Sequence, residues 1–478
     1  MNHSHLLCAF GSMALAAFLS STTPSHAASC PGGNTCYYVN ATTGNDANAG
    51  TSASSPWKTV ARVNAQHFNP GEVVYFARGQ KWREQLQISS SGTAALPITF
   101  RSYGSGAQPI ISGSDVITSW APYTPNIYYS AQSSWANAPG VTIQDGTPLR
   151  LVPWSGSIAA TQRSLTAGSF TVDYTNKIVY IWSTDSQPPS THTIEVAHRL
   201  YGVENNKKNF VTINGLTFEH AAFHCAYASS TTSFHIVGST LRICGGTYIG
   251  GGLIAGNGIE WSGNGSNNSL QDSTVTGVLD SCASPQLYGS NETLRDTTIS
   301  GNTLSYCGMN GVEISIQGPS AGVSNLDSFI SGVTITRNKI YETGGGWSSN
   351  REGSGIVAYN NDGSVTSAIT GVRISENIIH SNAKDGVELR RYSGMSIVDH
   401  NRISDNAKDG VEVTDDLNPT STGIHLFDNL IYDNAKHGLE RNVPASQAFH
   451  IYNNVLTNNG SDAPPPRQDQ RNSSTPNN

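Results

Sequence analysis

A glutamate recurs at the end of a short motif that the chain contains three times. The motif reads NAKDGVE at 382–388 and 406–412, and NAKHGLE at 434–440. Side chains alternate along a strand, so Glu388 and Glu412 are predicted to point outward while their apolar neighbours face a core. Stacked strands lie about 4.8 Å apart, where two carboxylates repel by about 3.5 kcal/mol at an effective dielectric constant near 20. The chemistry of this column therefore depends on what offsets its charge.

The same alternation predicts three columns of outward side chains on one face. The first is Glu313, Val357, Glu388, Glu412 and Glu440; the second is Ser315, Tyr359, Arg390, Thr414 and Asn442; the third is Gln317, Asn361, Tyr392 and Asp416. A Gly-rich loop at 344–355 precedes the Val357 rung and is predicted to overhang this face. The predicted substrate-binding residues are Tyr359, Asn361, Arg351, Trp347, Glu313, Arg391 and Tyr392.

Cleavage of a uronate-containing polysaccharide by β-elimination is the activity that we predict for this face. A base removes a proton beside the uronate carboxylate, whose charge must be neutralised. Calcium suits that task because it takes oxygen ligands, and the predicted ligands are Glu388, Glu412 and Asp416. The predicted catalytic residues are Arg390, Glu388, Glu412, Lys384 and Lys408.

Three alternatives stay open. Glu388 and Glu412 on neighbouring rungs match the separation of about 5 Å in a retaining glycoside hydrolase, and Glu313 with Glu388 approaches the roughly 6.5–9.5 Å of an inverting one. A non-catalytic glycan-binding or adhesion solenoid fits the same face. The third alternative is a solvated surface ladder in which Lys384, Lys408 and Lys436 neutralise the glutamates. Two further features are an outward Glu260 in GIEWS and the pair His220 and His224, which we interpret as structural.

The elements that must position these residues are short strands with polar turns, repeated at intervals of about 24 residues, without helical periodicity. This pattern predicts an all-β solenoid of parallel strands. An asparagine marks the corner of each unit and is predicted to stack on its neighbours through its amide. The predicted members of this column are Asn302, Asn338, Asn377, Asn401, Asn429 and Asn453.

The segment 36–113 contains YYVNATTGNDANAGT, SPWKTVARVN, PGEVVYFARG and PITFRSYG. It resembles the entry of secreted right-handed parallel β-helix proteins of the pectate-lyase superfamily, and the resemblance extends over 200–460. The resemblance implies a right-handed β-helix and a carbohydrate-active protein. It does not select a reaction, because the superfamily contains lyases, hydrolases, epimerases and non-enzymatic spike proteins. Residues 57–64 are predicted to form an amphipathic capping helix.

The organisation predicted from these patterns has five parts. Residues 1–28 are a signal peptide, 29–113 the cap and first coils, 114–198 an inserted aromatic-rich β subdomain, 199–460 the remaining coils, and 461–478 a disordered tail. The run SFTVDYTNKIVYIW inside the insert is predicted to be a hairpin. Its aromatics are interpreted first as a small core and second as a surface for sugar rings.

The signal peptide predicts secretion into the periplasm or the medium, with a lipoprotein on Cys30 as the less favoured alternative. Six cysteines follow it, and Cys30–Cys36, Cys225–Cys244 and Cys282–Cys307 are predicted to form disulfides. The net charge of −7 without a basic stripe argues against nucleic acid as a partner. We expect a monomer without a membrane span, with a polysaccharide as its substrate.

Overall fold

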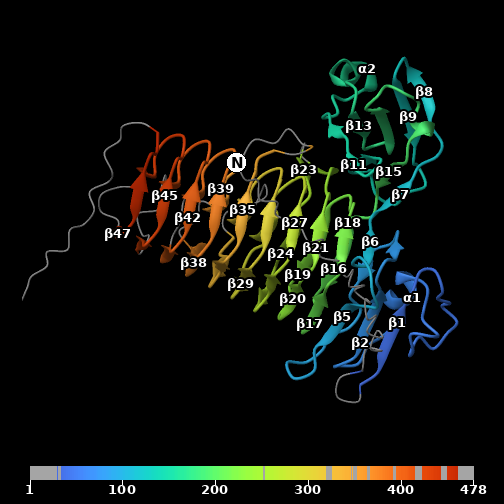
Figure 1. Cartoon of the computed structure of the whole chain (residues 1–478), viewed down its shortest axis with the longest axis horizontal. Helices are drawn as coiled ribbons and strands as arrows, with labels where there is room; N and C mark the ends of the chain where they lie inside the picture. The colour runs from blue at the N-terminus through green and yellow to red at the C-terminus, as the bar shows by residue number, and fades with distance from the viewer. Residues whose placement is uncertain are drawn as a thin grey trace, which may run out of the picture.

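The computed structural model describes residues 30, 34–250, 253–318, 326–345, 347, 353–362, 366–390, 394–414, 423–442 and 449–460. The predicted signal peptide and tail lie outside this range, as do four predicted site residues, Arg351, Arg391, Tyr392 and Asp416. The described chain forms a long solenoid of stacked coils with a smaller β subdomain above its N-terminal coils (Figure 1).

Most coils contribute one short strand to each of three parallel sheets. The twelve-stranded sheet contains β1 (Cys36–Val39), β2 (Val73–Ala77), β5 (Ile98–Tyr103), β17 (Val211–Asn214), β20 (Phe234–Val237), β26 (Ser269–Gln271), β30 (Thr298–Ser300), β34 (Thr334–Thr336), β38 (Val372–Ser375), β41 (Ser396–Asp399), β44 (Ile424–Phe427) and β47 (Phe449–Tyr452). The eleven-stranded sheet contains β3 (Lys81–Trp82), β6 (Ile110–Ser112), β18 (Thr217–Glu219), β21 (Thr240–Arg242), β27 (Thr274–Thr276), β31 (Thr303–Ser305), β35 (Lys339–Tyr341), β39 (Ile378–His380), β42 (Arg402–Ser404), β45 (Leu430–Tyr432) and β48 (Val455–Thr457).

The third sheet carries the predicted face. This ten-stranded sheet contains β4 (Leu86–Gln87), β16 (Tyr201–Asn206), β19 (His224–Ser229), β24 (Ile259–Ser262), β28 (Ala283–Leu287), β32 (Val312–Ile316), β36 (Ile356–Asn360), β40 (Val387–Arg390), β43 (Val411–Thr414) and β46 (Leu439–Asn442). A short parallel sheet beside it contains β25 (Gly265–Ser266), β29 (Thr293–Arg295), β33 (Phe329–Ser331) and β37 (Ala368–Thr370), and β22 (Thr247–Gly250) pairs with β23 (Leu253–Ala255) as a hairpin.

The register of the ten-stranded sheet agrees with the alternation read from the sequence. Glu388 pairs with Glu412, and Glu412 with Glu440 on the following rung. The apolar residues between them point inward, and Val387, Leu389 and Val411 are fully buried in the main core. Coils of different length thus stack with their apolar side chains in register.

Asparagine side chains join the coils at one corner, as predicted. The Oδ1 of each ladder residue accepts hydrogen bonds from the backbone and side-chain nitrogens of the preceding one, from Asn302 to Asn338 and onward. The last described member of the ladder is Asn454, so the prediction of Asn453 was wrong. Asn453 has a φ of 55°, as the residues before the other ladder asparagines do, so the left-handed corner belongs to the preceding residue.

A second asparagine ladder is formed by the first residue of each NAK motif, together with Asn459. Asn382, Asn406, Asn434 and Asn459 bond to one another in the same manner. Because both ladders are buried and satisfy their amides on neighbouring coils, they fix the height of each rung. The NAKDGVE motif is therefore first a structural repeat, and its charged members are placed by this framework.

The N-terminal end of the core is closed by α1 (Val60–Asn64), a shorter helix than the predicted 57–64. Thr59 caps it by accepting a hydrogen bond from the Arg62 backbone nitrogen. Val60 and Val63 are buried against the core together with Trp57. The three predicted disulfides are present, Cys30–Cys36, Cys225–Cys244 and Cys282–Cys307.

The insert folds as two small antiparallel-rich sheets. Its elements are β7 (Ser114–Val116), β8 (Ala121–Thr124), β9 (Ile127–Ala131), β10 (Thr142–Gln144), β11 (Thr147–Pro148), β12 (Arg150–Leu151), α2 (Ile158–Thr161), η2 (Gln162–Ser164), β13 (Ser169–Asp173), β14 (Ile178–Trp182), η3 (Pro189–Thr191) and β15 (Ile194–Ala197). The predicted hairpin is confirmed as β13 and β14. Tyr180 stacks on Trp154, and Trp135 stacks on His198, so much of the aromatic content is used in packing.

Candidate active site

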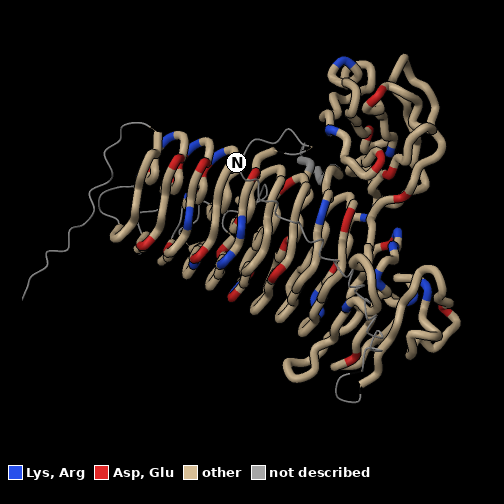
Figure 2. The backbone as a smooth tube through the Cα atoms, in the orientation of Figure 1, with Lys and Arg blue, Asp and Glu red and all other residues tan. Residues whose placement is uncertain are grey.

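Two rungs of the predicted glutamate ladder, Glu388 and Glu412, are neutralised by lysines of their own motif. Lys384 Nζ lies 2.9 Å from Glu388 Oε2, and Lys408 Nζ lies 2.6 Å from Glu412 Oε2. Acidic and basic segments accordingly lie close together on the C-terminal coils (Figure 2). Glu388 and Glu412 have exposed fractions of only 3% and 7%, since the lysines cover their outward-pointing carboxylates.

The contacts of Lys408 affect whether it can act as the predicted catalytic base. Lys408 Nζ also lies 3.6 Å from Asp385 Oδ2 and 3.6 Å from Asp409 Oδ2. Burial alone would lower the pKa of Lys408, but the hydrogen bond to Glu412 and the charge of Asp385 raise it above its usual value. A lysine held protonated cannot accept a proton, so Lys408 is poorly suited to act as a base.

The remaining predicted residues occupy several environments. Arg390 is half-buried, 4.9 Å from the Tyr359 ring and 3.5 Å from Glu388 Oε1. Asn361 is exposed at the end of β36. Trp347 instead packs into the insert, where its ring lies 6.3 Å from Phe170, and its indole nitrogen donates to the Gly277 carbonyl.

Glu388 and Glu412, two of the three residues predicted to bind calcium, already have hydrogen-bond partners. Oxygen ligands for calcium must be free to converge on the ion. Glu388 Oε2 instead accepts hydrogen bonds from Lys384 and from Ser354, and Glu412 Oε2 accepts one from Lys408. An ammonium group thus contacts one oxygen of each carboxylate, and Asp416, the third predicted ligand, lies outside the described residues.

A different group of carboxylates lies farther toward the N-terminus on the same face. Glu260 of β24 and Glu313 of β32 belong to the same outward column, with Ser284 of β28 on the rung between them. Glu313 Oε2 accepts a hydrogen bond of 2.6 Å from Ser281, and its Oε1 accepts one of 2.5 Å from Tyr359. We call His224, Glu260, Tyr288, Glu313 and Tyr359 the acid cluster.

The environment of Glu260 favours its protonated form. Burial raises the pKa of this carboxyl to about 7, and the nearby charge of Glu313 contributes to the rise. Its Oε2 accepts a 2.9 Å hydrogen bond from Asn257 and a longer one of 3.4 Å from Tyr288. Two rungs correspond to about 9.6 Å between Cα atoms, yet the side chains interact electrostatically.

His224 lies next to the same carboxyl oxygen of Glu260. Its Nδ1 accepts a hydrogen bond from the Asn257 backbone nitrogen, which assigns the proton to Nε2, and Nε2 lies 3.3 Å from Glu260 Oε2. Burial lowers the pKa of His224 to about 3, so the ring stays neutral at physiological pH. The rings of Tyr201 and Tyr227 stack on each other with centroids 4.9 Å apart, and the Tyr227 ring stacks 5.8 Å from the His224 ring. The three rings form an aromatic group next to the carboxyl group.

The acid cluster was only partly foreseen. Glu313 was predicted to bind substrate, as was Tyr359, whereas Glu260 was noted merely as outward-facing and His224 was interpreted as structural. The outward direction of Glu260 was correct. Its proximity to Glu313 depends on the register of β24, β28 and β32, whose coils lack the NAKDGVE motif that marks the later rungs.

Residues 257–464 match the family model of the right-handed β-helix region. The chain is a right-handed parallel β-helix. This fold confirms the class predicted from the sequence. In the described residues of this β-helix, no helix is both long and apolar enough to cross a membrane.

The β-helix is also similar to individual proteins. The lacto-N-biosidase of Bifidobacterium longum subsp. longum is 38% identical over 108 residues, which are 21% of this chain and 7% of that protein. The chain therefore spans a small part of this curated relative. A complex of XylC with xylose superposes with a TM-score of 0.59 at 14% identity, covering 88% of this chain and 75% of that one. A glycoside hydrolase gives 0.58 at 11% identity, covering 89% and 96%.

Proposed function

We propose that this β-helix is a carbohydrate-active enzyme that hydrolyses a glycosidic bond at the acid cluster. The observation that carries the proposal is a carboxyl with a raised pKa beside a second carboxylate stabilised by hydrogen bonds. A protonated carboxyl group near a second carboxylate is the arrangement by which glycoside hydrolases assign an acid and a base or nucleophile. The similar proteins support the class, because two of them carry hydrolase names.

Each member of the cluster has a role in this mechanism. Glu260, protonated near neutral pH, donates its proton to the oxygen of the leaving sugar. Glu313, held by Ser281 and Tyr359, acts as a carboxylate on the opposite side of the bond, either on water or on the anomeric carbon. The neutral His224 packs against the carboxyl group, with its Nε2 3.3 Å from Glu260 Oε2. The stacked Tyr201 and Tyr227 offer ring faces for a sugar.

The surroundings favour a neutral sugar over a uronate. In the described residues, the side chains in contact with the Glu260 and Glu313 carboxyl groups are uncharged donors and the neutral His224, with no lysine or arginine among them. β-Elimination on a uronate would instead use the C-terminal face, where Lys384, Lys408 and Arg390 all lie against carboxylates. We therefore propose hydrolysis of a neutral glycan, and β-elimination is the outcome against which it is tested.

The experiment is a substrate screen with two readouts. The purified chain is incubated with aryl glycosides, including xylosides and lacto-N-biosides, with neutral oligosaccharides and with uronate polysaccharides. Hydrolysis releases reducing sugar without ultraviolet absorbance, whereas β-elimination creates an absorbing double bond. Proton NMR of the first product gives the anomeric configuration and shows whether Glu313 acts on water or on carbon. Absorbance that appears only with uronates, and survives Glu260→Gln, would replace this proposal with the lyase.

A further inference from the structure

We call the rungs of Glu388, Glu412 and Glu440, with the lysine four residues before each glutamate, the lysine–glutamate ladder. Its last rung differs in sequence and in charge pairing from the two before it. Asp385, Asp409 and His437 occupy equivalent positions, since the backbone nitrogen of Asp409 donates to Asp385 Oδ1 at 3.0 Å, and that of His437 donates to Asp409 Oδ1 at 2.9 Å. The third motif copy thus replaces an aspartate with a histidine. The replacement sets an imidazole above a buried carboxylate at the end of the ten-stranded sheet.

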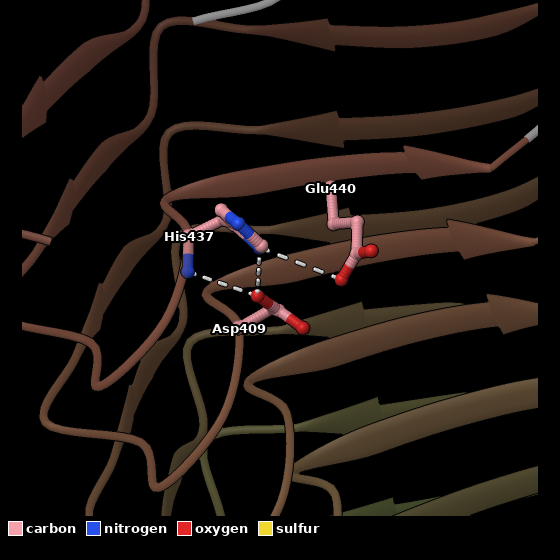
Figure 3. A group of neighbouring side chains, drawn as sticks. All are labelled: Asp409, His437 and Glu440. Carbon is pink, nitrogen blue, oxygen red and sulfur yellow. Dashed lines mark hydrogen bonds and ion pairs between the residues drawn. The ribbon is translucent and has the colours of Figure 1, made fainter. Parts of the chain in front are cut away.

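The charge pairing changes at the same rung. Lys384 and Lys408 each contact the glutamate four residues later. Lys436 is exposed and, among the residues that the structure describes, makes no ion pair with Glu440. His437 takes that place, with its Nδ1 2.8 Å from Asp409 Oδ1 and 3.5 Å from Glu440 Oε2 (Figure 3).

The three side chains converge with the spacing of metal ligands. One atom from each of Asp409, His437 and Glu440 lies within 4.8 Å of the other two. Two ligand atoms bound at about 2.1 Å to one ion lie about 3.0–3.4 Å apart, near the two distances from His437 Nδ1. In Figure 3 the ring and both carboxylates point toward a common space between neighbouring coils.

A second observation concerns Asp409 itself. The residue has an exposed fraction of 0%, yet its Oδ2 is buried without a hydrogen bond from any described group. Lys408 Nζ lies 3.6 Å away and is closer to Glu412, at 2.6 Å. The ion pair with Lys408 is too long to be a hydrogen bond, so a metal ion beside Asp409 would give Oδ2 a direct contact while offsetting the facing charge of Glu440.

We propose that Asp409, His437 and Glu440 bind a divalent first-row transition-metal ion, with zinc as the reference ion. One imidazole nitrogen and two carboxylates suit zinc and its neighbours, whereas calcium prefers ligands that are all oxygen. Asp409 precedes β43, and the other two ligands belong to the next coil. The bound ion would therefore join the last two rungs of the ten-stranded sheet, in which β46 is the final strand among the described residues.

The test measures zinc binding directly on the full chain without a histidine tag. After chelator treatment and dialysis, zinc chloride is titrated by calorimetry, and bound metal is counted by mass spectrometry. One ion per chain is expected. His437→Gln should weaken binding about 100-fold, and Glu440→Gln should weaken it about tenfold or more. The matched control is His450→Gln, an exposed histidine that stacks on His425 in the twelve-stranded sheet and should leave affinity unchanged.

Thermal unfolding keeps the test independent of activity. Zinc should raise the Tm of the wild-type chain and leave that of His437→Gln unchanged, because only a folded site binds the ion. Glu440 is half-buried and at the sheet end, so Glu440→Gln serves if His437→Gln unfolds. Absence of bound zinc in the wild-type chain overturns the proposal. Equal affinity in His437→Gln, or a loss of affinity in His450→Gln alone, also overturns it by placing the ion elsewhere.

Discussion

Two stretches of one outward column carry glutamates in opposite electrostatic states. In the acid cluster, Glu260 has uncharged hydrogen-bond donors and a second carboxylate nearby, and its pKa is raised to about 7. In the lysine–glutamate ladder, burial alone would raise the pKa of Glu388, but Lys384 and Arg390 lower it. Both residues are buried on the same sheet face. Strand register sets where a carboxylate points, and its neighbours decide whether it keeps its proton.

The largest difference between the two stretches should appear in catalysis. Glu260→Gln and Glu313→Gln should each reduce hydrolysis by about 10²–10⁴-fold, because general acid–base catalysis contributes that much. Glu412→Gln, on the ladder, should stay within about threefold of wild type, since its carboxylate is neutralised outside the proposed site. Initial rates on the best substrate of the screen measure the effect, with circular dichroism as the folding control. Loss of activity in Glu412→Gln alone would move the active site to the ladder.

Stability should respond most strongly to the loss of a ladder cation. Lys408→Met leaves Glu412, Asp385 and Asp409 without their shared ammonium group, and should cost about 3 kcal/mol of unfolding free energy. Lys436→Met is the matched control, because Lys436 is exposed and should change stability by less than about 0.5 kcal/mol. Urea unfolding at neutral pH measures both. Similar effects for the two lysines would contradict the ladder interpretation.

The pH dependence of stability should have opposite signs in the two stretches. Glu260 titrates near its ordinary 4.5 when unfolded and near 7 when folded, so its stabilising contribution is full below 4.5 and is lost as pH rises through 7. Glu260→Gln should therefore gain up to about 3 kcal/mol over wild type between pH 4 and pH 8.

The contribution of Glu388 to stability should depend on pH in the opposite direction. Its folded pKa is lowered, so its contribution is present above the unfolded pKa and is lost as pH falls through the folded one. Glu388→Gln should be destabilised at pH 7 and approach wild type in acid. Unfolding free energies measured at intervals from pH 3 to pH 8 test both variants, and parallel curves for the two would refute the contrast.

The smallest predicted effect concerns a hydroxyl group. Tyr359→Phe removes the donor to Glu313 Oε1 and should lower the hydrolysis rate about tenfold, since a hydrogen bond to a charged group contributes about 1.5–3 kcal/mol. Ser354→Ala removes the donor to Glu388 Oε2 in the ladder and should leave the rate unchanged. Steady-state kinetics on the same substrate compare the two. A rate loss in Ser354→Ala without one in Tyr359→Phe would reverse the assignment.

Much of the fold was readable because period and alternation repeat. The 24-residue interval and the Val387/Leu389 alternation predicted the pairing of Glu388 with Glu412. The burial of that pair was not predicted, because it depends on long side chains lying across the carboxylates. The acid cluster was harder to predict, because Tyr288 and Tyr359 donate hydrogen bonds to Glu260 and Glu313 from other rungs. Strand alternation does not predict contacts between side chains on different rungs.

The asparagine ladder has a consequence for how such a β-helix can diversify. Asn338 and Asn377 are 39 residues apart and Asn377 and Asn401 only 24, yet both steps make the same pair of amide hydrogen bonds. The corner accordingly fixes where a coil ends, whatever the length of chain between. Surface loops can then be lengthened, shortened or exchanged between coils while the outward column of the ten-stranded sheet keeps its spacing, which makes this β-helix a natural scaffold for grafting new binding loops.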